Sequence, residues 1–169
     1  MNEEEYHSTY QQVNNQRCVF EKMLLLRYGG CEFNQKLLLA EREAMACQSK
    51  AAQKSCIELL DTMRKNARFA LQITAANAPL PHAKEIRVQA GGLYGLQQFL
   101  NHKNTAKTKE LSEIKLKFTA NNSPPITNIS ETISLALEQF YQIENFPFNE
   151  IVKAIKHFEL PSRKRKKRR

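Results

Sequence analysis

Long apolar runs are missing from this sequence, and no stretch approaches the roughly 18 consecutive apolar residues that a membrane-spanning helix needs. A targeting pattern is missing as well, because the first residues, MNEEEYHSTYQQ, are acidic and polar, unlike secretory or mitochondrial signals. We therefore expect a cytoplasmic protein, or a nuclear one if the source is eukaryotic, with no membrane partner. In such a reducing compartment cysteines are more often thiols or metal ligands than disulfides.

The familiar motifs of catalysis are also absent. The sequence has no H-E-x-x-H, no G-x-S-x-G and no nucleotide-binding loop, and its four histidines are dispersed. Glu41 and Glu43 are two residues apart, so on a helix their side chains diverge. We leave catalysis open but favour a binding protein over a self-contained enzyme. A redox or transferase enzyme with one reactive cysteine is the least favoured hypothesis.

Positive charge is concentrated at the C-terminus. The net charge is +9, and the last seven residues are all basic, so subtracting them leaves +2 for residues 1–162. Such a block is predicted to be disordered until it meets a polyanion, and it would bind phosphates without sequence specificity and with steep salt dependence. The candidate nucleic-acid-binding residues are Arg163, Lys164, Arg165, Lys166, Lys167, Arg168 and Arg169.

A second, weaker basic patch is predicted on the third helix and the segment that follows it. It lacks the interleaved exposed aromatic residues of single-strand-binding platforms, so we give it less weight than the tail. Its members are Arg64, Lys65, Arg68, His82, Lys84 and Arg87.

Hydrophobic periodicity predicts an all-α fold. Apolar spacing of three and four indicates a helix over 8–28 that ends at Gly29-Gly30, and Asn34 and Ser49 are good N-caps for two more helices over 34–47 and 49–73. Because short loops join antiparallel neighbours, we expect a small bundle of three antiparallel helices, with further short helices and a disordered basic tail.

Composition divides the chain into four parts. Residues 1–102 are predicted to be a helical domain that holds all four cysteines, 103–125 a linker with one marginal strand at 114–118, 126–160 a two-helix segment, and 161–169 the tail. Within the first part, Gly91, Gly92 and Gly95 indicate either a helix break or a close approach of another backbone.

The four cysteines are the strongest candidate for a functional site. Cys18, Cys31, Cys47 and Cys56 are the only cysteines, with the spacing C-x12-C-x15-C-x8-C. On the predicted helices they would converge at one end of the bundle. Thiolates bind soft and borderline metals, and four of them complete a tetrahedral or cubane shell. Arg17, Arg42, Lys50 and Lys54 flank them and would offset the negative charge of a bound cluster.

The spacing favours an iron–sulfur cluster over zinc. Structural zinc sites usually contain two ligands two to four residues apart, and this sequence has no such pair. The resulting hypothesis is a metal-binding protein that contacts nucleic acid through its tail. The alternative is a metal-free helical adaptor, in which the cysteines are small core side chains and the Phe146/Phe148 segment helps to bind a protein partner.

Overall fold

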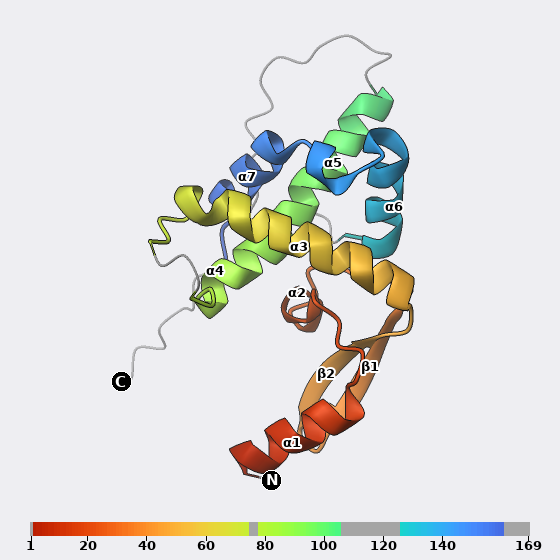
Figure 1. Cartoon of the computed structure of the whole chain (residues 1–169), viewed down its shortest axis with the longest axis vertical. Helices are drawn as coiled ribbons and strands as arrows, with labels where there is room; N and C mark the ends of the chain where they lie inside the picture. The colour runs from red at the N-terminus through yellow and green to blue at the C-terminus, as the bar shows by residue number, and fades with distance from the viewer. Residues whose placement is uncertain (1, 75–77, 106–125, 161–169) are drawn as a thin grey trace, which may run out of the picture.

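The computed structural model describes residues 2–74, 78–105 and 126–160. Figure 1 shows a body of packed helices and, projecting from it, a β-hairpin with a helix across its far end. The rest of the predicted linker beyond residue 105, the strand expected over 114–118 and the basic tail lie outside the described residues.

The projecting part contains helix α1 and strands β1 and β2. Helix α1 (Glu3–Val13) begins with a capping box, in which the Asn2 side chain accepts from the Glu5 N–H while the Glu5 carboxylate accepts from the Asn2 N–H. The antiparallel strands β1 (Asn34–Leu39) and β2 (Arg42–Cys47) pair in a register that places Asn34 opposite Cys47.

The all-α prediction is wrong. The segment expected to be a helix over 34–47 is this hairpin, so the fold combines many helices with a small antiparallel sheet, and the described residues contain no three-helix bundle. The chain reverses at Ala40, whose backbone has a left-handed φ of 55°. The outer edge of β2 also pairs with residues far back in the sequence, through an antiparallel bridge between Arg17 and Ala46. Such long-range pairing leaves no trace in helical periodicity.

The single helix predicted over 8–28 is also wrong. The helix stops at Val13, and a second, short helix α2 (Glu21–Leu25) starts only after an extended segment. The break is stabilised by tertiary contacts, because the Asn14 side chain is buried and donates from Nδ2 to the Met45 carbonyl. This hydrogen bond competes with continuation of the helix.

Helix α3 (Lys50–Ala70) confirms the third predicted helix. The Ser49 hydroxyl accepts from the Ala52 N–H at its start, as the sequence indicated. One face is buried in the core, through Cys56, Leu59, Leu60, Met63 and Ala67.

The remaining helices cover α3. Helix α4 (His82–Ile86), the π-helical turn η1 (Arg87–Gly91) and helix α5 (Gly92–Thr105) follow one another without interruption. Helix α6 (Ile129–Phe140), the 3-10 turn η2 (Ile143–Asn145) and helix α7 (Phe148–His157) complete the body, and α7 packs against both α5 and α3. The two helices expected between 126 and 160 are therefore confirmed.

Close backbone approach explains the glycines of α5 and η1. The chain stays helical there, and a Cβ at Gly95 would lie 2.7 Å from the Ala154 Cβ and 3.1 Å from the Ile151 Cα. Glycine is required because α7 crosses at this point.

Gly95→Val is expected to reduce the free energy of unfolding by about 2 kcal/mol, since the added methyl groups would push α7 away from α5. The measurement is the urea midpoint followed by circular dichroism. Ala83→Val, at an exposed position of α4, is the control and should cost well under about 1 kcal/mol. Equal losses in the two variants would show that α7 does not pack closely on Gly95.

Candidate metal centre

All four cysteines line one pocket. Its wall includes the start of β1, the end of β2 and the start of α3, which meet where the hairpin joins the helical body (Figure 1). The cysteines come from four separate places in the chain: the segment before α2, the turn after α2, the end of β2 and the second turn of α3. None is in a disulfide. The other residues that line the pocket are mostly apolar: Val19, Phe20, Phe33, Asn34, Ala52, Gln53 and Ile129.

Extended backbone pairing places Cys18 beside Cys47. The Cys18 N–H donates to the Met45 carbonyl over 2.9 Å, and the Cys47 N–H donates to the Gln16 carbonyl over 2.7 Å. Residues 16–18 thus run along β2 as a third extended segment. The Cys47 thiol also donates to the Ser49 carbonyl at the start of α3.

The hairpin register and the α3 cap bring in the other two thiols. Asn34 lies opposite Cys47, and its N–H donates to the Cys31 carbonyl, so Cys31 occupies the same end of the hairpin. Cys56 is buried and lies within the first two turns of α3. The four cysteines singled out by the sequence thus line one pocket, although Cys18 and Cys47 do not lie on helices as expected.

Burial dominates the electrostatics of the free thiols. It raises the pKa of Cys18 and of Cys56 to about 12 each, and the neighbouring cysteines add to both shifts. The two thiols are therefore protonated at neutral pH, which is unfavourable for a nucleophile.

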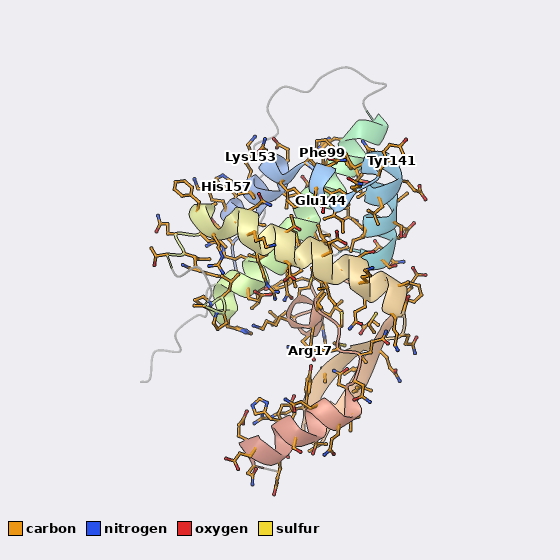
Figure 2. All side chains as sticks on the ribbon, viewed as in Figure 1. Arg17, Phe99, Tyr141, Glu144, Lys153 and His157 are labelled. Atoms are coloured by element: carbon orange, nitrogen blue, oxygen red, sulfur yellow. The ribbon has the colours of Figure 1, made fainter. Side chains whose placement is uncertain are left out.

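Among the residues that the structure describes, no charged side chain lines the pocket, and two of the four flanking cations are paired with carboxylates. Arg17 forms an ion pair with Glu21 over 2.8 Å, and Arg42 pairs with Glu3 over the same distance. Figure 2 shows Arg17 between α1 and the helical body. The amino end of α3 contributes positive potential at the pocket, because Ala52 and Gln53 of its first turn line the wall.

Two buried polar networks hold the pocket walls, and sequence reasoning did not find them. In the first, the Glu21 carboxylate accepts from the Tyr10 hydroxyl, from Arg17 and from the Met45 N–H. These hydrogen bonds link α1, α2 and β2 to the segment that contains Cys18. The only sequence signal was the spacing of four residues between Arg17 and Glu21.

The second network runs through Gln89. Its Nε2 donates to the Val19 carbonyl and to Glu85, and its Oε1 accepts from the Met23 N–H. Arg64 in turn forms a 2.7 Å ion pair with Glu85. Arg64 is therefore a structural residue that braces the pocket wall, and it is not available to the basic patch predicted around it.

The arrangement of the thiols differs from that of a simple ion site. Within residues 2–74, 78–105 and 126–160, no three His, Cys, Asp or Glu side chains are grouped so that they could hold one metal ion. The cysteines share a pocket without meeting at a single point.

Comparisons with known proteins yield no relative: no family model, no curated protein and no solved structure matches this chain. No helix in the described part of the chain is long and apolar enough to cross a membrane. The site must therefore be interpreted from its own chemistry.

Proposed function

We propose that Cys18, Cys31, Cys47 and Cys56 bind a metal centre, and that this centre is an iron–sulfur cluster. One observation carries the proposal: every cysteine in the chain lines the same pocket, although the four come from separate elements. Packing alone does not require four small side chains to gather in this way. Four thiolates form the usual ligand set of a cluster.

The spacing and the surroundings favour a cluster over zinc. In a [4Fe–4S] cluster each thiolate binds a different iron, so the four sulfurs need not approach one common point. A tetrahedral zinc site requires that closer arrangement, which the described side chains do not have. The apolar wall would shield a cluster from water, and the amino end of α3 would offset part of its negative charge.

Nucleic acid is the partner we propose for the basic tail. Support comes from the seven consecutive cations at 163–169, each able to neutralise a phosphate. Binding through such a segment is non-specific and does not depend on the metal centre.

The Phe146/Phe148 segment, which the adaptor alternative uses as a docking site, packs against the body. Phe146 is buried in the core, and Phe148 stacks against it with ring centroids 6.4 Å apart. Phe146 thus stabilises the core, and Phe148 is half-buried against it, so this segment presents little ring surface to a partner. A reactive nucleophile is disfavoured at Cys18 and at Cys56, because burial raises the pKa of these two thiols.

The experiment is an absorbance spectrum of the protein purified without oxygen, with iron, zinc and sulfide assayed in the same sample. A broad band near about 400 nm with stoichiometric iron and sulfide is expected. Detection of zinc without sulfide would indicate a mononuclear zinc site and contradict the cluster. A colourless protein with four titratable thiols and neither metal would refute the proposal.

A further inference from the structure

Phe69 is an aromatic side chain with almost no protein around it. It is the next-to-last residue of α3, and 96% of it is exposed to solvent. A single exposed apolar residue is ordinary, so its meaning depends on what surrounds it.

Positive charge surrounds this end of α3. Lys65 is exposed one turn before Phe69 on the same helix face. Lys84 donates from Nζ to the carbonyl of Leu71, two residues beyond Phe69. Two nearby carboxylates, Asp61 and the buried Glu85, are both paired with Arg64, and Glu159 is an exposed carboxylate at the end of the described chain.

The carboxyl end of α7 lies at the same side of the body. Helix α7 packs on α3, and Figure 2 shows His157 beside the carboxyl end of α3. Lys156 and His157 are both exposed. Arg87 connects this end to α4, because its guanidinium donates to the carbonyls of Lys156 and Phe158 over 2.6 and 3.0 Å.

The basic tail continues from this same end. The described chain stops at Leu160, which packs against the core two residues after Phe158, and the run of seven cations begins three residues later. The tail therefore follows in sequence from the segment that packs next to the end of α7.

We propose that the joined ends of α3 and α7 form a binding surface for single-stranded nucleic acid. Phe69 stacks on one base, while Lys65, Lys84 and Lys156 contact the flanking phosphates. An exposed ring with cations around it is the usual design of single-strand platforms, and the bases of a duplex are not open to such stacking. The inference rests on the nucleic-acid partner proposed for the tail, and it adds a folded surface and a preference for single strands.

The test is fluorescence anisotropy with a labelled oligothymidine of about 15 nucleotides, titrated into the full chain at several salt concentrations. Phe69→Ala should weaken binding about tenfold, which is the effect of losing one stacked base. The salt slope should not change, because the ring carries no charge. Phe69→Tyr should retain the wild-type affinity.

Tyr141→Ala is the matched control. Tyr141 is 84% exposed and follows α6, and Figure 2 shows it on the other side of the body from His157. Its replacement should leave the affinity unchanged.

Wild-type affinity in Phe69→Ala would overturn the stacking surface, and so would an equal loss of affinity for a duplex of the same length. The tail is judged separately, by a variant in which residues 163–169 are replaced by serine. If that variant binds normally while Phe69→Ala does not, the tail proposal fails and the surface stands. If the wild-type protein does not bind the oligonucleotide, both the tail proposal and the stacking surface fail. The exposed Phe69 ring would then be assigned to a contact with a protein.

Discussion

Cys→Ser substitution at any one of the four cysteines is expected to abolish the iron–sulfur absorbance and to destabilise the protein as purified without oxygen. Serine preserves the size of the side chain but is a poor ligand for iron. The losses of absorbance and of unfolding free energy should be similar in all four variants, because each of four segments supplies one ligand to the pocket. A tightly bound centre that is lost removes about 4 kcal/mol or more from the free energy of unfolding.

The control is Ala52→Ser. Ala52 lines the same pocket, so this variant adds a hydroxyl there without removing a thiol, and it should keep the absorbance band. The metal-free protein provides a second comparison, in which each Cys→Ser change should cost only about 1 kcal/mol. The cluster would be contradicted if the losses of unfolding free energy were unequal, largest at the buried Cys56, and the same with and without metal. The cysteines would then be core side chains.

Replacing residues 163–169 by serine should remove most salt-sensitive binding to DNA or RNA. Seven phosphate contacts imply a slope of log K against log salt of about −6 on duplex DNA, and roughly a four-thousandfold loss of affinity between about 50 and 200 mM salt. The variant should show a much shallower slope and correspondingly weak binding at low salt, because only the phosphate contacts proposed for the folded surface remain. Unfolding measurements should be unchanged.

A charge-preserving variant, in which all seven positions are lysine, separates charge from sequence. It should bind with nearly the wild-type slope, because each contact releases counterions whichever cation makes it. If affinity and slope survive the serine replacement, the tail is not the main nucleic-acid contact.

Sequence reasoning succeeded where structure is local. Helix α3 has a side-chain cap at Ser49 and one continuous buried face, and both features are readable from residue spacing. Helices α6 and α7, within the segment expected to hold two helices, were found for the same reason. Intrinsic preference and tertiary packing agree in these segments.

It failed where distant residues decide the structure. The segment over 34–47 contains Leu, Ala, Glu and Arg, all compatible with a helix, yet the pairing of β2 with residues 16–18 holds it as a strand. The same pairing breaks the predicted first helix after Val13. Local sequence patterns do not indicate an interaction between segments about thirty residues apart.

The candidate site was predicted in part. Residue type and count singled out the four cysteines, and their shared pocket follows from the fold. The roles of the charges were not predictable, because Arg17 and Arg64 serve buried carboxylates whose burial depends on distant elements. Phe69 was overlooked since an aromatic residue beside a buried face is normally part of the core.

The positions of the pocket residues in the chain determine the order in which the pocket is assembled during synthesis. Its four thiols belong to the first 56 residues, whereas one wall is completed by Ile129 at the start of α6. During synthesis the amino-terminal part of a chain emerges first, so the thiols leave the ribosome well before the wall that will enclose them. A centre inserted at that stage would join the ends of loops that the later helices then cover, and its loading would precede the closure of the body.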